Sequence, residues 1–174
     1  MKHKINIKTQ NYELPVLTRE GRFFARYSQK GLAELNFPAG QASTSETNGR
    51  YGGVGVKIRR WHRATESAVR EILAGQEPGK LPPLDFSAGT EFQKSVWREL
   101  RRISAGKAKS YGDIARAIGR PRAVRAVGGA CGKNPIPLLV PCHRVLAANK
   151  KIGGFSGGLH WKRKLLEREG VVFN

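Results

Sequence analysis

Hydrophobic and polar positions alternate along the first 40 residues of the chain, which is the period of a half-buried β-strand. The alternation begins at Ile5 and Ile7 and returns over residues 32–37, while residues 23–27 are predicted as a strand because they are rich in aromatics. Gly21 and Gly31 lie where turns between these strands would fall. Residues 41–53 consist mainly of Ser, Thr, Gly and Asn and predict a loop.

Helical spacing replaces the alternation between Ile58 and Leu73, and Gly75 is expected to end that helix. Residues 1–80 are therefore expected to form an α/β N-terminal domain, a small antiparallel sheet with a helix packed on it. Three prolines and two glycines fall within residues 78–89. We place a linker at residues 81–89 and a C-terminal domain at residues 90–174.

The C-terminal domain is expected to be mainly α-helical. Thr90 and Gln93 form the pattern of a capping box, which opens a helix that runs to about Ile103. Further helices are expected over residues 110–118 and 122–133, separated by a sharp turn at residues 119–121. The apolar residues of the last helix that we expect to face the core are Ala123, Val124, Ala126, Val127 and Ala130.

Two short helices joined by a glycine-containing turn, the second of them basic, are typical of a helix-turn-helix. An ordinary helix pair in a core would give the same pattern. The second helix is also rich in small residues, which suit a shallow DNA groove and tight helix–helix packing equally well.

The chain carries 32 Lys and Arg against 13 Asp and Glu, a net charge of +19. Such an excess favours a polyanionic partner, and nucleic acid is the commonest one in cells, although a charge tuned only for solubility is the alternative. There is no apolar run of the length of a membrane helix, and no pattern of a signal peptide. We expect a cytoplasmic protein, nuclear if the source is eukaryotic, that does not bind membranes.

The two cysteines, Cys131 and Cys142, are expected to be thiols, because a disulfide framework needs more of them. Neither they nor the scattered histidines show the spacing of metal ligands, so no metal is predicted. Cys142 follows Pro141 at a possible helix start and precedes His143 and Arg144. A helix start and nearby basic groups would lower the pKa of the thiol, as a nucleophile requires.

The segment from Pro141 to Val145, preceded by Asn134 and Pro135, resembles the signature of the O6-alkylguanine-DNA alkyltransferases, the methylated-DNA–protein-cysteine methyltransferases. The resemblance extends over residues 90–170. Residues 1–85 match that family only in layout, and from it we expect an RNase H-like N-terminal domain. The matching segments include Phe92-Gln93, Val96-Trp97, Ser110-Tyr111, Arg125-Ala126-Val127-Gly128, Ser156-Gly157-Gly158, Leu165-Leu166 and Glu169-Gly170.

The resemblance implies that the chain moves an alkyl group from guanine O6 in DNA to its own Cys142, irreversibly and once per molecule. Glu169 would orient His143, and His143 would take the thiol proton through a water molecule. Tyr111 would donate a proton or hydrogen bond to guanine N3. Asn134 would link the recognition helix to the active-site strand. No cofactor is implied, because the cysteine is the acceptor.

The resemblance also implies a substrate pocket and a DNA interface. The carbonyl groups of Cys142 and Val145 would accept from the guanine amino group, and the Ser156 amide would support O6. Arg125 would enter the base stack after the nucleotide is flipped out. The other implied pocket residues are Pro137, Gly153, Phe155 and Gly157, and the other implied contacts to the minor groove of double-stranded DNA are Ala123, Ala126, Gly128 and Lys133. A monomer is expected.

The chain departs from some relatives in having no cysteine in its N-terminal half, where they hold a structural zinc ion. Three other classes of protein fit parts of the pattern. An alkyltransferase-like protein that binds the lesion without transfer would have tryptophan in place of Cys142. A helix-turn-helix transcription regulator would need no Cys-His-Glu relay, and a cysteine hydrolase would need no DNA-binding helix.

Overall fold

The computed structural model describes residues 11–38 and 53–174 of the chain. The alternation at Ile5 and Ile7, and all but the last residue of the loop expected over residues 41–53, lie outside these ranges. Within them, no helix combines the length and the apolar content needed to cross a lipid bilayer.

A small antiparallel sheet forms one end of the molecule. Its strands are β1 (Tyr12–Thr18), β2 (Gly21–Tyr27) and β3 (Leu32–Asn36), joined in the order β1-β2-β3. The strands predicted over residues 23–27 and 32–37 are confirmed, and so is the turn at Gly21, whose φ of 125° is one that glycine adopts without strain. Pro15 lies in the edge strand β1, where a missing N–H interrupts no ladder.

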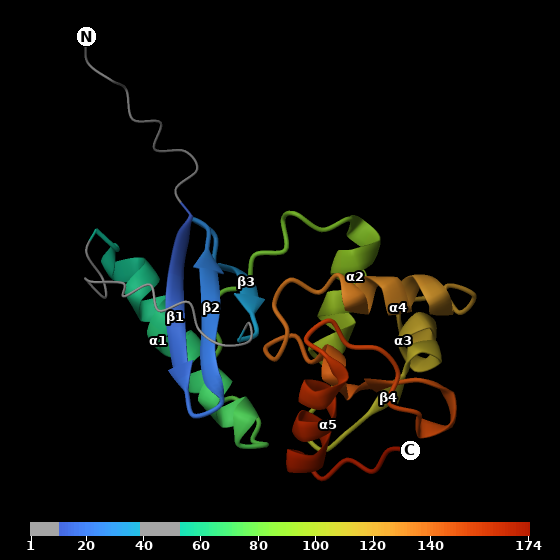
Figure 1. Cartoon of the computed structure of the whole chain (residues 1–174). Helices are drawn as coiled ribbons and strands as arrows, with labels where there is room; N and C mark the ends of the chain where they lie inside the picture. The colour runs from blue at the N-terminus through green and yellow to red at the C-terminus, as the bar shows by residue number, and fades with distance from the viewer. Residues whose placement is uncertain (1–10, 39–52) are drawn as a thin grey trace.

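One long helix, α1 (Val56–Leu73), covers the sheet (Figure 1). The apolar stripe predicted between Ile58 and Leu73 is buried, and Gly75 follows the helix with a φ of 78°. The Tyr27 hydroxyl of β2 donates to Thr65 Oγ1 of α1 at 2.8 Å, so the buried polar groups at this contact are paired. The prediction of a sheet with a helix packed on it is therefore confirmed.

The segment between the two ends of the molecule is bound to β3. Leu32 N donates to Pro83 O and Asp85 N donates to Leu32 O, both at 2.8 Å. A β-carbon at Gly31 would lie only 2.2 Å from Pro83 O, so the two backbones approach closely enough to require glycine. This proline-rich segment is thus held along the sheet by backbone hydrogen bonds.

Helices α2, α3 and α4 gather at the far end from α1, and α5 lies below them (Figure 1). The capping box of Thr90 and Gln93 is confirmed at the start of α2. A parallel pair of short strands, which we did not expect, joins the residues before α3 to the residues after the Cys142 motif. The elements are α2 (Glu91–Leu100), β4 (Lys109–Ser110), α3 (Tyr111–Ala117), α4 (Val124–Gly132), the 3-10 helices η2 (Cys142–Arg144) and η3 (Ala148–Lys150), β5 (Val145–Leu146) and α5 (Leu159–Arg168).

Two expectations about these helices were wrong. Helix α2 ends at Leu100, before Ile103, and Val124 and Ala126 of α4 face solvent, Val124 with 39% of its surface exposed. The reason is that α4 buries a narrow stripe against its neighbours, anchored where Trp97 Nε1 donates to Ala130 O at 2.9 Å. The buried residues of that stripe are Val127, Ala130 and Cys131.

Candidate active site

Cys142 is the first residue of η2, and only 4% of its surface is exposed. Its amide donates to Val140 O at 2.7 Å, so this N–H is already used within the chain. Helix η2 has three residues, which is too short for a substantial helix dipole. The motif therefore places the sulfur inside the protein and not at the start of a long helix.

Asn134 holds the sulfur in place from the end of α4. Its Nδ2 donates to Val140 O at 2.8 Å and to Cys142 Sγ at 3.1 Å, while its Oδ1 accepts from the Ile136 amide at 3.1 Å. Only 6% of the surface of Asn134 is exposed, and both of its N–H groups and its carbonyl oxygen have partners within the chain. The side chain thus joins α4 to the segment that leads into Cys142.

His143 and Glu169 form a buried pair, with His143 Nε2 and Glu169 Oε1 3.0 Å apart. Arg144 binds the same carboxylate through Nε, at 3.0 Å from Oε2, and through Nη2, at 2.9 Å from Oε1. Burial acts to raise the pKa of Glu169, but the hydrogen bonds from His143 and Arg144 and the charges of both groups hold this pKa below its ordinary value. Glu169 is therefore a carboxylate at neutral pH.

The charge state of Glu169 determines the tautomer of His143. A carboxylate can only accept, so Nε2 of a neutral His143 must carry the hydrogen, which leaves Nδ1 with a free lone pair. Burial lowers the pKa of His143 in spite of Glu169, so the ring is neutral at pH 7. Nδ1 is buried and has no hydrogen-bond partner within the described part of the chain, so it is free to accept a proton.

The expectation that Cys142 has a lowered pKa was wrong. Burial raises the pKa of its thiol to about 11, and the opposing effects of the Asn134 hydrogen bond and the Lys162 charge are smaller. The basic residues beside it do not help, because His143 and Arg144 both turn to Glu169. The sulfur is a thiol at neutral pH, so any nucleophilic role requires a base to remove its proton.

Tyr111 is the first residue of α3, after an N-cap at Ser110 that forms a capping box with Asp113. A β-carbon at Gly153 would lie 3.3 Å from the Tyr111 hydroxyl, which places this group beside the glycine-rich loop. Burial, followed by the charges of Cys131 and Cys142, raises the pKa of Tyr111, so the phenol keeps its proton. A hydrogen-bond donor therefore faces the same site as the thiol.

Comparison with known proteins identifies the family to which this arrangement belongs. Residues 91–171 match a family model described as 6-O-methylguanine DNA methyltransferase, DNA binding domain. A methylated-DNA–protein-cysteine methyltransferase of Methanosarcina acetivorans is 39% identical over 145 residues, covering 82% of this chain and 87% of that protein. The chain belongs to the O6-methylguanine DNA methyltransferase family.

Solved structures of this methyltransferase family have the same fold. The crystal structure of Mycobacterium tuberculosis OGT in complex with DNA has a TM-score of 0.72 and 34% identity, covering 90% of this chain and 91% of that chain. The O6-methylguanine-DNA methyltransferase of Pyrococcus kodakaraensis has a TM-score of 0.58 and 26% identity, covering 93% and 100% of the two chains. The similarity therefore includes the N-terminal sheet as well as the segment that carries Cys142.

The other residues predicted for the site of this methyltransferase fall into two groups. In the first group, Pro137 and Ser156 line one hollow together with Asn134, and Val145 is buried just beyond η2. Gly153, with a φ of 67°, lies against Tyr111, and Phe155 and Gly157 continue the loop towards α5. On α4 and its flanks, Arg125, Ala126 and Lys133 are exposed, while Ala123 and Gly128 are half-buried.

Lys162 of α5 is a site residue that the sequence analysis missed. Its side chain is fully buried, and its Nζ donates to Val145 O at 2.6 Å and to Gly154 O at 3.2 Å. Burial lowers the pKa of its ammonium group to about 8. In the sequence Lys162 looks like one residue of a solvated basic run, and only its helical phase with Leu165 and Glu169 marks it as inward-facing.

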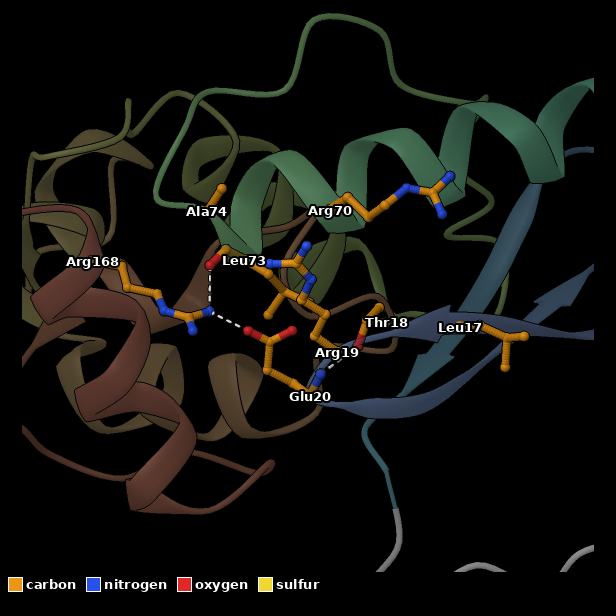
Figure 2. Close-up of a pocket in the computed structure, with 8 residues that line it drawn as sticks. All are labelled: Leu17, Thr18, Arg19, Glu20, Arg70, Leu73, Ala74 and Arg168. Atoms are coloured by element: carbon orange, nitrogen blue, oxygen red, sulfur yellow. Dashed lines mark hydrogen bonds and ion pairs between the residues drawn. The ribbon is translucent and has the colours of Figure 1, made fainter.

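A second hollow lies away from this site, between the β1–β2 turn, the end of α1 and α5, and none of the predicted site residues lines it (Figure 2). Arg168 Nη1 bridges two of these elements, since it lies 2.7 Å from Glu20 Oε1 and also donates to Leu73 O. Arg70 extends away from that ion pair (Figure 2). The residues that line this hollow thus connect the two ends of the molecule.

Proposed function

We propose that this methyltransferase repairs O6-alkylguanine in double-stranded DNA by moving the alkyl group onto Cys142. The observation that carries the proposal is the buried thiol held at 3.1 Å from Asn134 Nδ2, next in sequence to a His143–Glu169 pair. The relatives named methylated-DNA–protein-cysteine methyltransferase support the same reaction.

The reaction is one in-line displacement. The sulfur attacks the alkyl carbon, a carbon–sulfur bond forms, and the bond between that carbon and guanine O6 breaks. The thiol proton passes through a water molecule to His143 Nδ1, and Tyr111 donates towards guanine N3 as the electron pair moves onto the base. The transfer needs no cofactor, because Cys142 is itself the acceptor. The thioether that forms is stable, so each molecule acts once.

The guanine is held by groups on both sides of the sulfur. The Cys142 and Val145 carbonyls accept from the guanine amino group, and the Ser156 amide supports O6, with Pro137 and residues 153–158 as walls. Val145 O already accepts from Lys162, but a carbonyl has two lone pairs and keeps one for the base. Asn134 joins this pocket to α4.

Helices α3 and α4 act as a helix-turn-helix that enters the minor groove of DNA. The exposure of Arg125 and Ala126 on α4 supports this role, because the surface of α4 that avoids the core is small-sided and basic. Arg125 fills the place of the flipped nucleotide, and Ala123, Gly128 and Lys133 contact the backbone or groove beside it. The net charge of +19 favours the approach to DNA.

We also propose an RNase H-like N-terminal domain over residues 1–80, a linker over residues 81–89 and a C-terminal domain over residues 90–174, in a monomeric protein.

The proposed alkyl transfer is tested by incubating the full chain with a duplex that carries one O6-methylguanine and measuring the mass of the intact protein. We expect one methyl increment per molecule, mapped to Cys142. A chain that binds the lesion with unchanged mass would instead act as an alkyltransferase-like protein without transfer.

The role of Arg125 is tested by replacing it with alanine. Filling the vacated stack offsets an unstacking free energy of a few kcal/mol, so we expect Arg125→Ala to slow transfer from duplex DNA on the order of tenfold to a hundredfold. Transfer from the free base O6-benzylguanine needs no flipping and should stay close to wild type.

The matched control is Arg63→Ala, which removes an exposed arginine from α1, at the other end of the molecule from α4 (Figure 1). It should leave both rates near those of the wild type. Equal losses on the duplex and on the free base in Arg125→Ala would remove the flipping role from Arg125.

A further inference from the structure

The edge of the N-terminal sheet contacts the segment that leads into Cys142. Leu35 N of β3 donates to Pro135 O at 2.9 Å, one residue after Asn134. This bond fixes one wall of the proposed guanine pocket, the segment that contains Pro137, relative to β3. Asn36 and Phe37, at the end of β3 and just beyond it, therefore lie beside this segment.

Phe37 follows β3 by one residue and reaches the other wall of the pocket. Its ring lies 5.6 Å from the ring of Phe155, at an interplanar angle of 74°, and 5.1 Å from the ring of Trp161. Phe23 supports it from β2 at 5.5 Å. The contact with Phe155 is edge-to-face and the other two are tilted, and ring contacts at these separations are favourable, so a ring held by three others has little freedom to move.

Gly157 lies directly against the Phe37 ring. A β-carbon there would be 2.5 Å from Phe37 Cε2 and 2.9 Å from Phe155 Cε1, so any side chain would displace a ring or the loop. The φ of Gly157 is not one of the positive values that call for glycine. The close approach of Phe37 is therefore the reason that this position suits glycine.

An open hollow lies where these parts meet, and its lining includes Asn36 and Phe37 from the N-terminal part and Asn134, Pro137 and Ser156 from the site. On its far side the loop is bound by Lys162 Nζ, which donates to Gly154 O at 3.2 Å. The loop is thus held between α5 and Phe37. A change on either side would alter the width of the pocket.

From these contacts we propose that Phe37 is a positioning residue of the N-terminal part, which sets the place of the 153–158 loop and so the size of the alkyl group that Cys142 accepts. The inference rests on the proposed function. Phe37 touches the loop through Phe155 and Gly157 and takes no part in the chemistry. A methyl group needs the loop close to the sulfur, whereas a benzyl group needs it farther away.

The test compares transfer from two duplexes of one sequence, carrying O6-methylguanine or O6-benzylguanine. Misplacing a wall by about an ångström costs up to about a hundredfold in rate, so we expect Phe37→Ala to slow methyl transfer by about tenfold. The ratio of benzyl to methyl rates should rise at least about fivefold, because the loop can retreat. Phe37→Leu keeps part of the apolar bulk, so its methyl-transfer rate and its benzyl-to-methyl ratio should lie between those of the wild type and those of Phe37→Ala.

Phe24→Ala is the matched control, since Phe24 is a half-buried phenylalanine of β2 that alternates to the other face of the sheet from Phe23. It should lose stability without changing the benzyl-to-methyl ratio. Gly157→Ala provides a second arm. We expect it to slow methyl transfer in the wild type and to cost less in the Phe37→Ala background, where the nearer of the two rings that its β-carbon meets is gone and the Phe155 ring has room to move.

Hydrogen exchange of the DNA-free protein keeps this inference separate from the proposed function. Gly158 N donates to Phe155 O at 3.1 Å, and we expect its exchange to quicken in Phe37→Ala more than in Phe24→Ala. An unchanged ratio of rates, an unchanged exchange rate at Gly158, or an equal cost of Gly157→Ala in both backgrounds would overturn the role of Phe37. A wild-type chain that gains no alkyl group, together with quickened exchange at Gly158 in Phe37→Ala, would overturn the proposed function while leaving Phe37 as the residue that places the loop.

Discussion

The Cys142→Ser variant is expected to bind a duplex that carries O6-methylguanine and to transfer no methyl group to itself. A hydroxyl is a far weaker nucleophile than sulfur, and the same relay cannot ionise it to a useful degree. Loss of a nucleophile of this kind typically lowers the rate by about 10⁴-fold or more. The DNA-facing residues of α4 are untouched, so binding should persist. Intact-protein mass and fluorescence anisotropy of the labelled duplex measure the two properties separately.

Cys131→Ser is the control for this variant. Cys131 is the other buried thiol, and burial raises its pKa to about 12, so we expect it to be unreactive. Its variant should gain one methyl increment at a rate near that of the wild type. Cys142 would not be the acceptor if Cys142→Ser gained a methyl increment, or if Cys131→Ser were the only variant of the two that gained none.

The His143→Phe variant is expected to slow transfer at pH 7 and to acquire the pH dependence of an unaided thiol. Because the pKa of Cys142 is raised to about 11, only about one thiol in ten thousand is ionised at pH 7 without a base. General-base catalysis typically contributes about 10²–10⁴-fold, and we expect a loss of that size. Phenylalanine fills the buried space of the imidazole and cannot take a proton.

The shape of the pH profile separates the base from a structural role. In the wild type His143 has a lowered pKa and stays neutral, so the rate should be nearly flat above pH 7 and fall only as the pH drops through that pKa. In His143→Phe the rate should rise about tenfold per pH unit towards pH 10, as the thiolate fraction grows. The free base O6-benzylguanine is the substrate of choice, because DNA binding then plays no part. A variant profile parallel to that of the wild type would leave His143 a structural role only.

Much of the fold could be read from short-range patterns. A cluster of aromatic residues predicted β2, period-2 alternation predicted β3, helical spacing predicted α1, and Thr90 with Gln93 predicted the start of α2. Each of these patterns depends on neighbours within a few residues. The strand pair β4–β5 could not be predicted in this way. It joins two-residue segments that lie far apart in the chain, so no local pattern marks their pairing.

The sequence of Pro141 to Val145, with the match over the C-terminal part, identified the family and the residues that the proposed reaction uses. The sequence by itself therefore determined which side chains are present and the order in which they occur. It also determined the net charge of +19, which depends on composition alone. These properties need no knowledge of which surfaces meet.

The tertiary structure decided how those side chains behave. Cys142 has a raised pKa because the fold buries it and directs Arg144 to Glu169. Lys162, one of several adjacent basic residues, is the one that turns inward, and Phe37 meets a loop 120 positions away in the chain, at Gly157. Burial and long-range contact depend on how whole elements pack, and a local pattern says which face of an element is apolar but not which partner covers it.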